Sequence, residues 1–121
     1  MSSTHSVKVD PSLPIDVSIV PHSPHVVVTR FWVRKPGGDW TKVDPDGDCQ
    51  DGQPDTRHVG PLAPGSSVSY WLGIGGKPGS TYLVGVTVGQ NGALLSGGTW
   101  LERGDTDDKG AAECEGQINL S

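Results

Sequence analysis

Hydrophobic and polar residues alternate most regularly in residues 66–89, SSVSYWLGIGGKPGSTYLVGVTVG. The apolar residues at even-numbered positions are Val68, Tyr70, Leu72, Ile74, Tyr82, Val84, Val86 and Val88. Because side chains alternate across a strand, each half of this set can line one buried face. The pattern predicts two strands joined by a loop at residues 75–79 into a β-hairpin. In that hairpin Leu72 lies opposite Tyr82, and Tyr70 lies opposite Val84.

Shorter alternating stretches predict further strands along the chain. They lie near residues 6–9, 15–19, 25–35, 40–43, 56–59, 93–95, 99–103 and 112–120. Turn-forming sequences rich in proline, glycine and asparagine separate them, among them PHSP, PGGD and QNG. The spacing predicts an all-β fold, most simply an antiparallel β-sandwich of immunoglobulin or fibronectin type. A small barrel or jelly roll is the alternative.

Composition supports this prediction and excludes some partners. The chain has 121 residues, which fits one β-sandwich domain over residues 1–121, and its 18 glycines and 10 prolines disfavour helices. The net charge is −5 and no basic tract occurs, which argues against nucleic acid as a partner.

No apolar run approaches the ~18 residues of a membrane span. The first ten residues do not resemble a secretory signal, so we expect the protein to be cytoplasmic or released by a route without a signal.

Three of the four tryptophans occupy positions that the alternation assigns to the polar side of a strand. Trp71 lies among serines and glycines, and in the predicted hairpin it faces Leu83. Trp32 shares its parity with two arginines, and Trp100 shares its parity with Glu102. Outward tryptophans often mark a recognition surface. The alternative is that one tryptophan belongs to the core and that loops or strand edges cover the others.

Indole rings stack on the C–H faces of sugars, while polar side chains bind the hydroxyl groups. The pattern therefore predicts a non-enzymatic recognition module, most simply a lectin-like protein that binds carbohydrate. The expected ligand-binding residues are Trp71, Trp32, Trp100, Arg30, Arg34 and Asp39. The alternative is a structural or assembly subunit, or a protein-interaction sandwich, in which the same aromatic surface contacts a protein or a second copy.

The acidic stretch at residues 44–55 resembles part of a calcium-binding loop. Asp44, Asp46 and Asp48 fall at positions 1, 3 and 5 of the template, and Asp55 falls at position 12. Cys49 replaces the glycine that position 6 needs, and aspartate replaces the usual bidentate glutamate at position 12. The stretch is therefore either a calcium site or a solvated loop rich in turn-forming residues. No other cofactor is expected.

Both cysteines are flanked by acidic residues. Negative charge beside Cys49 and Cys114 disfavours the thiolate, so neither resembles an activated nucleophile. They form either one disulfide or two reduced, inert thiols. The chain also lacks the G-x-S-x-G motif and the phosphate-binding loop, and no catalytic residue is expected.

Overall fold

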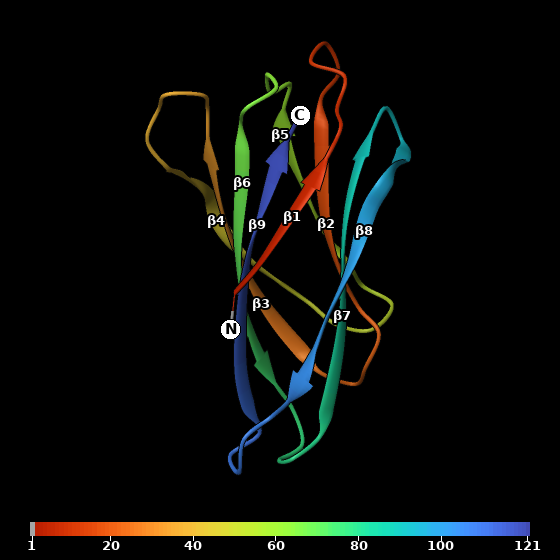
Figure 1. Cartoon of the computed structure of the whole chain (residues 1–121). Helices are drawn as coiled ribbons and strands as arrows, with labels where there is room; N and C mark the ends of the chain where they lie inside the picture. Colours follow the sequence, from red (N-terminus) through yellow and green to blue (C-terminus); the bar gives the residue numbers. More distant parts are fainter. Residues whose placement is uncertain (1) are drawn as a thin grey trace.

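The computed structural model describes residues 2–121, which form two β-sheets packed face to face (Figure 1). The five-stranded sheet has the order β1-β9-β6-β3-β4, and the four-stranded sheet has the order β5-β2-β7-β8. The first comprises β1 (Ser2–Val7), β9 (Ala111–Leu120), β6 (Ser67–Gly75), β3 (Val26–Arg34) and β4 (Thr41–Cys49). The second comprises β5 (Asp55–Gly60), β2 (Ile15–Pro21), β7 (Thr81–Gln90) and β8 (Ala93–Asp105). The predicted all-β fold with two packed sheets is confirmed.

Neighbouring strands are antiparallel except β1 and β9, which run parallel. In residues 2–121 no helix is long and apolar enough to cross a membrane.

The core lies between the two sheets and contains the residues that the alternation predicts. All eight apolar residues at even positions in residues 68–88 are buried there. Ile15, Val17 and Ile19 of β2 are also fully buried, as is Phe31 of β3. The alternation of apolar and polar residues therefore predicts the inward side of these strands correctly. It does so because the alternation arises when one face of a strand is buried and the other is exposed.

The predicted hairpin between residues 66–74 and 80–89 is wrong. β6 pairs with β3 and β9, whereas β7 pairs with β2 and β8 in the other sheet. The chain crosses from one sheet to the other through residues 76–80, where the Gly76 and Gly79 N–H groups donate to carbonyl groups of the β8–β9 loop. The two apolar faces therefore meet across the core instead of lying side by side. Either arrangement buries the same residues, so alternation alone cannot separate them.

The first half of the acidic stretch, residues 44–49, belongs to a strand instead of an irregular loop. β4 extends through Cys49, and a register irregularity in its pairing with β3 lies between Thr29 and Phe31. The two predicted short strands at 93–95 and 99–103 likewise form the single strand β8. In both cases an irregularity in the ladder accommodates a segment whose sequence does not alternate cleanly.

The two cysteines are buried free thiols, so the disulfide alternative is wrong. Cys49 lies on β4 and Cys114 on β9, and both β3 and β6 lie between these strands. Three strand spacings of about 4.8 Å place the two residues roughly 14 Å apart, far beyond the ~7 Å limit of a disulfide. Burial raises the pKa of Cys49 to about 11 and that of Cys114 to about 12, which keeps both protonated at neutral pH.

Candidate functional site

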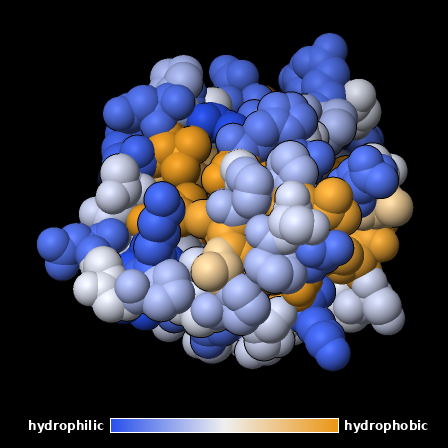
Figure 2. Space-filling model, turned by 90° about the horizontal axis from the view of Figure 1, so that it is seen from above, coloured by the Kyte–Doolittle hydropathy of each residue, from blue (hydrophilic) through white to orange (hydrophobic). Residues whose placement is uncertain are grey.

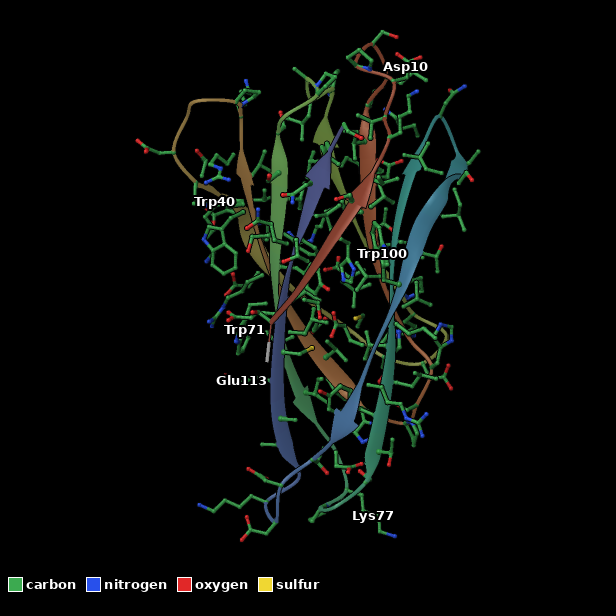
Figure 3. All side chains as sticks on the ribbon, in the orientation of Figure 1. Asp10, Trp40, Trp71, Lys77, Trp100 and Glu113 are labelled. Atoms are coloured by element: carbon green, nitrogen blue, oxygen red, sulfur yellow. The ribbon has the colours of Figure 1, made fainter. Side chains whose placement is uncertain are left out.

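The outer face of the five-stranded sheet brings together most of the predicted ligand-binding residues. Arg30, Trp32 and Arg34 alternate with buried residues along β3, and Trp71 of β6 lies directly opposite Arg30. Trp40, which precedes β4, packs against Arg34 from the same side. Figure 3 shows Trp40 and Trp71 on this flank of the molecule. We call these five residues the tryptophan platform.

Trp71 is held in one orientation by its neighbours. The Arg30 guanidinium carbon lies 4.7 Å from the centre of the Trp71 ring. A Cβ atom at Gly73 would lie 2.5 Å from Trp71 Cη2, so only glycine at this position leaves room for the indole along the strand. The indole is half-buried and leaves part of its surface accessible to a ligand.

The Asp46 carboxylate of β4 neutralises Arg30. The Arg30 Nε donates to Asp46 Oδ2 at 3.0 Å, and Lys42 Nζ lies 2.8 Å from Asp46 Oδ1. Hydrogen bonds from Lys42 and then Arg30 hold the pKa of the Asp46 carboxyl below its usual value. Lys42 Nζ also lies 3.6 Å from Asp44. The result is a small ionic network beside Trp71 in which two cations meet two anions.

A row of hydroxyl and amide side chains borders the platform. Ser69 of β6 lies opposite both Trp32 and Gln117, and Gln117 lies opposite Thr4 of β1. Asn119 Oδ1 accepts hydrogen bonds from Ser67 Oγ at 2.9 Å and from Gln117 Nε2 at 2.8 Å. A polar hollow of about 240 Å³ lies here, and it is lined by Ser2, Ser3, Thr4, Ser69, Glu115, Gly116 and Gln117.

A second hollow on the same face is apolar. It has a volume of about 450 Å³ and contains Val26 and Val28 of β3, Trp71, and the glycines at 73 and 75. Trp71 and Glu115 also line a small depression next to it. Trp71 therefore lies between an apolar surface and a polar one, which is an arrangement suited to an amphipathic ligand.

Trp100 does not belong to the platform, and its predicted outward orientation is wrong. It lies opposite the buried Val86, packs against the core and stacks on His5 of β1 with ring centres 4.5 Å apart. Figure 3 shows it beside β8, apart from Trp40 and Trp71. The parity with Glu102 was misleading because Glu102 is itself buried, where it accepts a 2.5 Å hydrogen bond from the Tyr70 hydroxyl.

Asp39 lies at the edge of a cleft between the two sheets. The cleft has a volume of about 570 Å³, and its apolar lining consists of Val33, Val43, Val59 and Leu62. Figure 2, which views the molecule from this end, shows apolar side chains among hydrophilic ones. Asp39 precedes Trp40 in the β3–β4 loop and is exposed, so it borders both the cleft and the platform.

The four aspartates of the predicted calcium loop do not converge. Asp46 binds Arg30 and Lys42, whereas Asp55 accepts hydrogen bonds from Thr29 Oγ1 and Arg57 Nε at the edge between β4 and β5. In residues 2–121 no group of three or more histidine, cysteine, aspartate or glutamate side chains is arranged to hold a metal ion. On strand β4, Asp44 and Asp46 both lie within 4.0 Å of the Lys42 ammonium group, so the cation between them is a lysine of the protein itself.

We expect the melting temperature of the protein to be the same in millimolar calcium chloride and in EDTA. A cation that bound only the native state would raise stability with its concentration, but Asp46 and Asp55 are already paired with cationic side chains. Thermal unfolding with magnesium as the matched divalent control measures this. A rise of several degrees that is specific to calcium would contradict the expectation and restore the calcium site.

Sequence reasoning missed several members of this face. Trp40 was not among the predicted ligand-binding residues, and Gln117 and Asn119 were not recognised although they alternate with buried residues in β9. The signal was present in that alternation, but nothing local indicates that β9 lies next to β6.

Comparisons with known proteins find no family model that matches the chain, no matching curated protein and no matching solved structure. A function for the chain is therefore inferred from the geometry of the platform.

Proposed function

We propose that the protein is a non-enzymatic recognition module that binds carbohydrate on the tryptophan platform. The observation that carries the proposal is the shared face of Trp32, Trp40 and Trp71 with a row of hydroxyl and amide side chains. A face of this kind extends over several strands and offers contact to a chain of sugars.

The chemistry of the face matches that of a sugar ring. The C–H face of a pyranose is apolar and its edges carry hydroxyl groups, so it needs an aromatic surface with donors and acceptors beside it. Trp71 supplies the aromatic surface, Ser69 supplies a hydroxyl group on the same strand, and Gln117 and Asn119 supply amide groups on the neighbouring strand β9. Because Arg30 and Gly73 hold the indole in place, less side-chain entropy is lost on binding.

For the fold type, we propose that the sandwich is immunoglobulin-like or fibronectin-like in architecture. Two packed, mainly antiparallel sheets support this proposal. In the immunoglobulin order the neighbouring strands F and G follow one another in the chain. Here the neighbours β6 and β9 are separated by β7 and β8 of the other sheet. The proposal therefore concerns the architecture and not the connections.

A protein-interaction or assembly role is the second candidate, favoured by the apolar hollow. Val26 and Val28 are 51% and 39% exposed, and they line this hollow together with Gly73 and Gly75. Such a patch is typical of surfaces that pack against another protein. A measurement of molar mass in solution separates the candidates, because self-association through this patch gives a dimer that Val28→Ser returns to a monomer.

We expect Trp71→Ala to weaken glycan binding by about 10- to 30-fold, since truncating a central aromatic residue costs about 2 kcal/mol. The glycan is first identified on an array and then titrated by calorimetry. Leu101→Ala is the matched control, because Leu101 is 61% exposed on strand β8 of the other sheet. A wild-type protein that binds no glycan on the array would overturn the proposal, as would equal binding by Trp71→Ala and Leu101→Ala.

A further inference from the structure

We infer that the glycan bound by the platform is anionic, and that the guanidinium of Arg34 binds its carboxylate or sulfate group. The inference rests on the proposed function and adds the charge class of the ligand. It starts from a difference between the two arginines of the platform.

Arg30 and Arg34 differ in whether the protein already neutralises them. Arg30 donates to Asp46, which also pairs with Lys42. Arg34 differs because, within residues 2–121, no carboxylate oxygen lies within 4.0 Å of its nitrogens and no side chain accepts a hydrogen bond from it. An arginine that is half-buried without an anionic partner can gain one from a ligand at little desolvation cost.

Stacking orients Arg34 for this role. Its guanidinium carbon lies 4.6 Å from the centre of the Trp40 ring. An arginine stacked through its face keeps the N–H groups in its plane available, and this planar fork matches the two oxygens of a carboxylate. Trp40 therefore limits the orientations of Arg34 without occupying its donors.

The surroundings of Arg34 favour an anion that is part of a sugar. On the side away from Trp40, Arg34 lies opposite Ser67, which in turn lies opposite Asn119. Because Asn119 Oδ1 accepts from both Ser67 and Gln117, its amide group can donate to a ligand. Trp32 is two residues away on the same face. A glycan of a few sugar residues can thus contact an indole, an amide donor and a guanidinium along this face.

Few negatively charged side chains lie near Arg34, but they limit its affinity for an anionic ligand. Asp39 is adjacent to Trp40 in the loop, and Glu115 lies beyond Trp71 on β9. Lys35 adds a positive charge next in the chain. The whole protein carries a net charge of −5, so attraction to a polyanion is local and is screened within about 8 Å at physiological salt. We therefore expect binding of anionic glycans to weaken as salt rises.

The test compares neutral, uronate and sulfated polysaccharides as ligands for the wild-type protein and for Arg34→Gln. We expect the wild-type protein to bind an anionic polymer about tenfold or more tightly than a neutral glucan at 50 mM salt. Arg34→Gln should bind both at the level of the neutral polymer. Arg103→Gln is the matched control, since it removes the same charge from β8 in the other sheet. Arg34→Lys keeps the positive charge but removes the planar fork of donors, so it separates the two contributions to binding. Thermal unfolding shows that each variant is folded.

The outcomes distinguish this inference from the proposed function. Equal affinity of the wild-type protein for neutral and anionic polymers overturns the anionic class while the carbohydrate-binding role stands. An equal loss in Arg34→Gln and Arg103→Gln also overturns the role of Arg34, because it indicates long-range charge alone. Absence of binding to every polymer overturns both. The uronate and sulfated arms show which anion Arg34 prefers.

Discussion

Replacing Gly116 with alanine is expected to destabilise the protein by about 3 kcal/mol, because it would add an atom where none fits. A Cβ atom at position 116 would lie 2.3 Å from the Tyr70 hydroxyl oxygen and 2.4 Å from the adjacent ring carbon. Tyr70 is fully buried, and its hydroxyl donates to Glu102 Oε1 at 2.5 Å. The ring cannot move aside without breaking that bond and leaving a buried carboxyl group short of a donor.

Urea unfolding of the wild-type protein and of Gly116→Ala measures this effect. Gly75→Ala is the matched control, because a Cβ atom at Gly75 at the end of β6 meets nothing within 4 Å. That substitution should change the free energy of unfolding by less than about 1 kcal/mol. If Gly116→Ala were as stable as Gly75→Ala, the tight contact between Tyr70 and β9 would be refuted.

Raising the pH from 8 to 10 is expected to lower the free energy of unfolding by about 2 kcal/mol. Burial raises the pKa of Cys49 to about 11 and that of Cys114 to about 12, from an ordinary value of 9.0. Between pH 8 and 10 the unfolded chain releases these protons while the native protein keeps them. The unfolded state then binds fewer protons than the native state, so stability is fully present near pH 8 and falls as pH rises.

Urea unfolding at pH 8, 9 and 10 with a reductant present follows this loss. The range ends at pH 10 because an ordinary tyrosine is half ionised there, and burial raises the pKa of Tyr70 and Tyr82 as well. The double variant Cys49→Ala and Cys114→Ala provides the control. It should be less stable at pH 8 but lose much less stability between pH 8 and 10. An identical decline in both proteins would show that other groups cause it.

The inward face of most strands could be predicted because it depends on local sequence. Alternation at period two records which side of a strand avoids water, whatever lies next to it. Val68, Tyr70 and Leu72 were therefore predicted correctly as core residues, and Arg30 and Trp71 as outward residues. The same rule failed at Trp100. The buried Glu102 on its side of β8 gains its hydrogen bond from a residue 32 positions away in the chain.

The predictions that failed depended on contacts between distant segments. The calcium loop required Asp44 and Asp55 to converge, but their positions depend on β4 and β5 lying at the edges of different sheets. The disulfide required β4 and β9 to be close, and the two strands between them decide otherwise. Neither arrangement leaves a signal in the spacing of the residues concerned.

By itself, the sequence determined that the chain is all-β, which side of most strands faces the core, and that Trp32, Trp71, Arg30 and Arg34 point outward. These properties follow from the alternation of side chains, which every strand carries locally. Only the tertiary structure decided that β6 and β7 belong to different sheets and that β3 lies beside β6. It also decided that Arg34 stacks on Trp40 without an anionic partner. Strand order is a property of the whole chain, because alternative pairings bury the same apolar residues and differ only in which distant side chains meet.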